Sequence, residues 1–111
     1  MNSMIKNVDW SKIARRALTP TEVVTRLAQL EGWTLRGEGP DVAIEKTYQF
    51  ANYYQTMAFV NALAFVAHVS DHHAELLVTY NRCVVRFNTH DVHGISDTDF
   101  QCAAAADGLL A

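Results

Sequence analysis

The sequence is poor in cysteine, in proline and in long apolar runs, with two cysteines and two prolines among 111 residues. Cys83 and Cys102 lack CxxC spacing, which favours two free, buried thiols in a reducing compartment over a disulfide. The longest apolar stretch, residues 57–67, contains Asn61 and is too short to cross a bilayer. The first twelve residues hold no long apolar segment, so we expect no signal peptide and a cytoplasmic protein.

Basic residues are also scarce. Nine Lys and Arg stand against twelve Asp and Glu, for a formal net charge of −3. Proteins whose main partner is a nucleic acid usually carry a basic face, so no nucleic-acid partner is expected. Lys12, Arg15 and Arg16 cluster near the N-terminus, where we expect them to form a solvated face.

Apolar residues, by contrast, make up half of the chain, enough for the core of a single domain. Residues 1–17 show no clear periodicity and are interpreted as an N-terminal extension with one short helix at most. Residues 18–111 are interpreted as the domain.

The first strong pattern is LTPTEVVTRLAQLEGW, residues 18–33. Thr19 fits the N-cap of a helix, Pro20 the first helical position and Glu22 the third, which together form a capping box. We expect the helix to end at Gly32.

Later patterns complete the fold. They predict two strands within residues 33–36 and 43–50, a helix over 51–70, a hairpin over 75–90 turning near Asn81 and Arg82, and a last helix capped by Ser96 and Asp99. Hairpins that alternate with helices predict an α+β two-layer sandwich. We expect a four-stranded antiparallel sheet with three helices on one face, in the order α-β-β-α-β-β-α.

The predicted helix over residues 51–70 is apolar on nearly every side. A helix of this kind is buried on more than one side, and one sheet covers only one of them. The other side is therefore expected to meet another subunit.

Three of the five histidines lie in the stretch SDHHAELLVTYNRCVVRFNTH, residues 70–90. His72 and His73 stand at the end of the long helix, and His90 follows the last strand. A helix end and a strand end can meet at one edge of a sheet, which would gather these imidazoles for general acid–base chemistry. Three carboxylates could tune them: Asp71, Asp91 and Asp99.

Two other interpretations stay open from spacing alone. His68 and His72 lie four apart on one helical face and, with a distant histidine, could bind zinc, although no HExxH motif is present and the cysteines lie elsewhere. Alternatively, the histidines are surface and loop-end residues without a chemical role.

The run from residue 68 to residue 99 resembles the pterin-4a-carbinolamine dehydratases, also known as the dimerisation-cofactor family. The matching positions are a residue four before a double histidine, the double histidine itself, a small residue, an aromatic residue, a third histidine and an aspartate: His68, His72, His73, Ala74, Tyr80, His90 and Asp99. The segments LTPTEV and IEKTYQF also look like the family's start and second strand.

This resemblance implies loss of water from 4a-hydroxytetrahydrobiopterin to give quinonoid dihydropterin, which recycles tetrahydrobiopterin for the aromatic amino acid hydroxylases. It implies His72 and His90 as the acid–base pair and His73 as the residue that binds and orients the pterin. Residues expected to line or support the pocket are Asp71, Asn88, Thr89, Asp91, His68 and Asp99. The family needs no metal and no bound cofactor, and its members form dimers and tetramers.

Four positions depart from the family's usual pattern. Ala74 replaces a proline that would fix the backbone, Leu76 replaces an aromatic residue, and His93 replaces a small residue. His68 replaces the commoner glutamate, a change that this position tolerates. Some proteins of this fold have lost the activity and assist assembly of Rubisco in carboxysomes. That function is the alternative, because a shared fold does not decide function.

Overall fold

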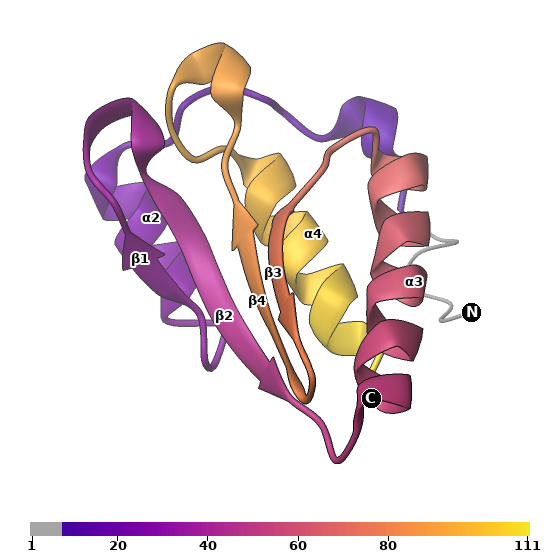
Figure 1. The fold of residues 1–111 in the computed structure, drawn as a ribbon. Helices are drawn as coiled ribbons and strands as arrows, with labels where there is room; N and C mark the ends of the chain where they lie inside the picture. Colours follow the sequence, from indigo (N-terminus) through magenta and orange to yellow (C-terminus); the bar gives the residue numbers. More distant parts are fainter. Residues whose placement is uncertain (1–7) are drawn as a thin grey trace.

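The computed structural model describes residues 8–111 as a four-stranded antiparallel sheet with three α-helices on one face, which confirms the predicted fold class (Figure 1). The strands lie side by side in the order β1-β2-β4-β3. The strands are Thr34–Arg36 (β1), Ala43–Gln49 (β2), Glu75–Thr79 (β3) and Arg82–Phe87 (β4). The helices are Pro20–Leu27 (α2), Tyr53–Ser70 (α3) and Asp97–Gly108 (α4), with three short 3-10 turns at Trp10–Lys12 (η1), Gly39–Asp41 (η2) and His90–Val92 (η3).

The predicted capping box of the first helix is present. The Glu22 amide donates to the Thr19 hydroxyl, and the Thr19 amide donates to the Glu22 carboxylate. The predicted end at Gly32 is wrong, because α2 ends at Leu27. Amides beyond it bond to carbonyls three residues back, so the chain tightens into turns that bring Trp33 into the core.

Alternation along the strands separates a core face from an open face. On β4, Cys83, Val85 and Phe87 are buried beneath the helices, and each is at most 1% exposed. Arg86, between Val85 and Phe87, therefore points to the open face. The pairing places Arg86 beside Glu45 of β2 and Glu75 of β3.

Helix α3 buries one side and exposes the other. Its core side includes Phe59, Leu63 and Val66. On the opposite side, Tyr54 is 83% and Phe65 is 41% exposed. Within residues 8–111, no helix is long and apolar enough to cross a membrane.

The two cysteines are free and buried, as predicted. Burial raises the pKa of both thiols, that of Cys102 to about 12. Cys102 lies on α4, whose N-terminus shows the predicted Ser96–Asp99 capping box.

The basic residues near the N-terminus, Lys12, Arg15 and Arg16, are exposed, as expected, and both arginines also make hydrogen bonds. Arg15 donates from Nη2 to the carbonyl oxygens of Ser70 and Asp71, at 2.7 and 3.0 Å. Arg16 instead forms a bidentate ion pair with the Glu22 carboxylate. Of the short helix expected in residues 1–17, the structure describes η1; residues 1–7 lie outside the described part.

Candidate active site

The end of α3 determines where His72 and His73 lie. Asp71 follows the helix with a left-handed backbone (φ 49°, ψ 45°). The amides of Asp71 and His72 bond to the carbonyls of His68 and Ala67, a Schellman-type ending. The chain then continues outside regular structure into β3. The two histidines differ in exposure: His72 is buried and His73 is exposed.

His72 lies on the core side of the sheet and is 7% exposed. Its Nε2 is 2.5 Å from Oδ1 of Asp99, and its ring is nearly parallel to that of Phe87, with centroids 6.1 Å apart. When the Asp99 carboxyl group is ionised, Nε2–H of His72 is the donor. This contact fixes the orientation of the imidazole.

Asp99 is the centre of a buried hydrogen-bond network. Its Oδ2 accepts from the Thr89 hydroxyl at 2.7 Å and from the Ser96 amide at 2.9 Å. The hydroxyl groups of Thr89 and Ser96 are 2.6 Å apart. Because Thr89 precedes His90, the network joins the loop that carries His90 to the turn that carries His72.

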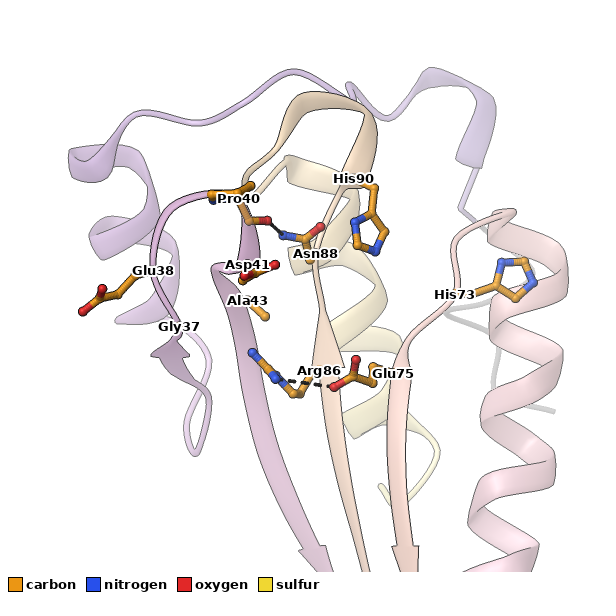
Figure 2. A pocket seen from close by; sticks show the side chains of 10 residues that line it. All are labelled: Gly37, Glu38, Pro40, Asp41, Ala43, His73, Glu75, Arg86, Asn88 and His90. Carbon is orange, nitrogen blue, oxygen red and sulfur yellow. Dashed lines mark hydrogen bonds and ion pairs between the residues drawn. The ribbon is translucent and has the colours of Figure 1, made fainter.

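A pocket of about 600 Å³ opens on the other face of the sheet (Figure 2). Its lining comes from the β1–β2 loop, the start of β2 and β3, and the end of β4: Gly37, Glu38, Pro40, Asp41, Ala43, His73, Glu75, Arg86, Asn88 and His90. His73, from the connection between α3 and β3, and His90, from η3, thus line the same pocket, with His73 on the side nearer α3 in Figure 2. Both side chains are exposed to solvent, which leaves them free to meet a ligand.

The pocket also holds charged and amide groups with unused hydrogen-bonding capacity. Arg86 lies between Glu45 and Glu75 at 3.5 and 3.4 Å, and its buried Nε has no partner of hydrogen-bond geometry among the described residues. Asn88 donates from Nδ2 to the carbonyl of Val42, while its buried Oδ1 has no partner within the described part of the chain. Asn88 Oδ1 is therefore an acceptor without a hydrogen bond among the described residues, whereas Arg86 Nε is within ion-pair distance of Glu45.

Not all of the residues predicted for the site line this pocket. His73, His90 and Asn88 do, whereas His72 and Thr89 belong to the buried network behind it. The remaining predicted residues are not in the pocket lining: Asp71, Asp91 and His68 are exposed, and Asp99 is buried. Among residues 8–111, no group of three His, Cys, Asp or Glu side chains could hold a metal ion.

Arg86, Glu75 and Asp41 also line the pocket, although no functional role was predicted for them from the sequence. A signal for Arg86 was present in the chain, because alternation along β4 places Arg86 on the same side as Asn88. The pairing of Glu75 with Arg86 was not predicted: the hairpin turns at Tyr80 and Asn81, one residue earlier than expected, and the expected turn would have set Glu75 opposite Asn88.

Comparison with known proteins identifies relatives along nearly the whole chain. Residues 16–109 match the family model described as pterin 4 alpha carbinolamine dehydratase. A protein of Paracidovorax citrulli is 66% identical over 99% of this chain and 95% of its own length. One from Bdellovibrio bacteriovorus is 54% identical over 85% of this chain and 78% of its own. Both carry the provisional name pterin-4-alpha-carbinolamine dehydratase.

Two solved structures share the fold. A protein from Brucella melitensis, described as a transcriptional coactivator/pterin dehydratase, has a TM-score of 0.81 and 27% identity, covering 86% of this chain and all of its own. A pterin dehydratase-like protein described as a RuBisCO assembly factor in the alpha-carboxysome has a TM-score of 0.61 and 21% identity, covering 71% of this chain and 89% of its own. With the family model matched over most of its length, this chain belongs to the pterin-4-alpha-carbinolamine dehydratase family.

Proposed function

We propose that this protein dehydrates 4a-hydroxytetrahydrobiopterin to quinonoid dihydropterin and so recycles tetrahydrobiopterin for aromatic amino acid hydroxylases. The observation that carries the proposal is that His73 and His90 line one pocket of about 600 Å³. Pockets that hold small ligands typically measure roughly 300–1,000 Å³. The pterin substrate follows from family membership.

The reaction needs one proton donor and one proton acceptor. The bond between C4a and its hydroxyl oxygen breaks, N5 loses its proton, a C4a=N5 double bond forms, and the hydroxyl group leaves as water. Imidazoles exchange protons near neutral pH and suit both tasks. We assign the two tasks to His73 and His90, because these are the histidines in the pocket lining.

His72 has a different role in this proposal from the acid–base role that the resemblance implied. Its ring is buried and its Nε2 is engaged by Asp99. Because His73 is the next residue, fixing the His72 ring also restricts the backbone that carries His73. His72 is thus a positioning residue in the proposed mechanism.

Arg86 and Asn88 are suited to recognise the pyrimidine edge of a pterin. That edge presents N3–H and a 2-amino group as donors and the 4-carbonyl oxygen as an acceptor. Asn88 Oδ1, which has no hydrogen bond among the described residues, would accept from a donor of the substrate. The Arg86 guanidinium, held between Glu45 and Glu75, would donate to the carbonyl.

We also propose that the protein works as a homodimer or homotetramer in the cytoplasm. The outer side of α3 exposes Tyr54, Phe65 and neighbouring alanines, a surface that association of subunits would cover. The free cysteines fit a reducing compartment.

The test is a dehydration assay with synthetic 4a-carbinolamine. The proposal expects the purified protein to accelerate loss of water well above the spontaneous rate. A rate equal to the spontaneous rate, combined with stable binding of the protein to Rubisco, would instead support the assembly function named for one structural relative.

A further inference from the structure

The N-terminal segment lies over the elements that hold the buried side of the site. Trp10 of η1 packs against the core beside α3, and the Leu18 amide donates to the Ile95 carbonyl at 2.8 Å. Between them the Thr98 hydroxyl contacts the Ala14 carbonyl at 3.4 Å. In Figure 1 the chain between η1 and α2 crosses the end of the molecule at which α3 ends and α4 begins. His72 lies two residues after the end of α3, and Asp99 lies in the first turn of α4.

Within this segment, Arg15 makes the contact closest to the histidine turn. The backbone amides at the end of α3 donate to the carbonyl oxygens of Ala67 and His68. The carbonyl oxygens of Ser70 and Asp71 therefore need other hydrogen-bond donors. Arg15 Nη2 supplies both bonds, at 2.7 and 3.0 Å. A cation at a helix C-terminus also interacts favourably with the helix dipole.

These bonds fall on the residues that determine how the histidines leave the helix. Asp71 adopts a left-handed backbone without being glycine, a conformation that needs support from its surroundings. Directly after it come His72, tied to Asp99, and His73, which lines the pocket. The guanidinium thus holds the peptide groups immediately before both side chains.

We infer that Arg15, which lies before the family match at residues 16–109, is a positioning residue of the active site. It links the N-terminal segment to the Asp71–His72–His73 turn and thereby fixes His73 in the pocket. The expected effect of Arg15 on catalysis rests on the proposed dehydratase function. Its expected effect on the position of His73 rests on the Arg15 contacts alone.

Arg16 provides a matched control. It is the neighbouring arginine, with the same charge, but its hydrogen bonds go to Glu22 at the start of α2 rather than to the turn. Arg15→Ala is expected to lower kcat by roughly tenfold while KM changes by less than about threefold, because small misplacements of a catalytic group reduce the rate more than binding. Arg16→Ala is expected to leave both constants unchanged, and Arg15→Lys to restore part of the lost kcat.

A second readout does not depend on enzymatic activity. In two-dimensional NMR spectra of histidine-labelled protein, Arg15→Ala is expected to shift the ring signals of His72 and His73 and to leave that of His93 in place. Wild-type kcat together with unshifted His72 and His73 signals would overturn the inference. So would equal shifts of all histidine signals, because that pattern indicates a general loss of structure.

Failure of the inference and failure of the proposed function are distinguishable. If the wild-type protein has no dehydratase activity, the proposed function falls and the NMR comparison alone decides the role of Arg15. If Arg15→Ala does not fold, Arg15→Gln, which keeps an N–H donor without the charge, is measured by the same criteria.

Discussion

Nε2 of His72 lies 2.5 Å from Oδ1 of Asp99, in a contact between two residues that are 7% and 0% exposed. The same carboxyl group accepts from Thr89, the residue before His90. The two segments that carry the pocket histidines are therefore joined behind the sheet by one side chain. This arrangement explains how two exposed loops can present imidazoles in a fixed relation.

Asp99→Asn tests that connection. The amide keeps the shape of the side chain, but its NH2 group must face another donor, and His72 loses its charged partner. We expect the free energy of unfolding to fall by about 2–4 kcal/mol, measured by urea denaturation, since such a change disrupts several bonds to one buried group.

Asp91→Asn is the matched control, because Asp91 is exposed. Its effect is expected to stay within about 0.5 kcal/mol, as for most surface substitutions. Equal effects of the two variants would show that the Asp99 network does not stabilise the fold.

The cysteines allow a test of the core. Burial raises the pKa of the Cys102 thiol to about 12 and also raises that of Cys83, so neither forms appreciable thiolate at neutral pH. We expect no reaction with a thiol-specific disulfide reagent at pH 8 in the folded protein, and reaction of both cysteines after unfolding in guanidinium chloride. Rapid labelling of either thiol in native buffer would contradict the described packing.

The capping box gives the fold a defined response to acid. Hydrogen bonds from Arg16 lower the pKa of Glu22 from 4.5 to about 2. A carboxylate whose pKa is lower in the folded state stabilises the fold fully above its unfolded pKa and loses this contribution as the pH falls toward its folded pKa. Stability should therefore decline between pH 4.5 and pH 2.

Glu22→Gln removes the titrating group, and Arg16→Ala removes the largest cause of its lowered pKa. The thermal unfolding midpoint of both variants is expected to fall less steeply than that of the wild type over the same pH range. An unchanged slope in Glu22→Gln would assign the acid sensitivity to other carboxylates.

The exposed side of α3 predicts the behaviour of the protein in solution. Phe65→Glu places a charge on the apolar surface proposed to join subunits, and should shift the protein toward the monomer in light scattering coupled to size exclusion. Val24→Glu, on the exposed side of α2, is the control and should not change the mass. A wild-type protein that is monomeric at all concentrations would contradict the proposed assembly.

The sequence was sufficient for most of the fold because its signals are local. Thr19, Pro20 and Glu22 mark the start of α2, and alternation on β4 separates Cys83 from Arg86. The end of α2 was not predicted correctly, because the sequence before Gly32 keeps a helical pattern. In the structure, backbone amides there bond to carbonyls three residues back, which ends the α-helix early.

The site was less predictable, because it depends on contacts distant in sequence. The adjacent His72 and His73 identified the turn in the sequence. The left-handed backbone of Asp71 and the contact with Asp99, 27 residues after His72, determine which of the two histidines faces the core. The hydrogen bond from Arg15 to the Ser70 carbonyl joins residues 55 apart in the sequence, so no local sequence pattern predicts it.

The central claim is that His73 and His90 exchange protons with one pterin, and the most direct measurement is kcat for dehydration of 4a-carbinolamine by the single alanine variants. Loss of a general acid or base typically costs 10²–10⁴-fold, so we expect kcat to fall by about 100-fold in His73→Ala and in His90→Ala, with unchanged thermal stability. His68→Ala, outside the pocket lining, should retain the wild-type rate. Wild-type kcat in folded His90→Ala would contradict the account.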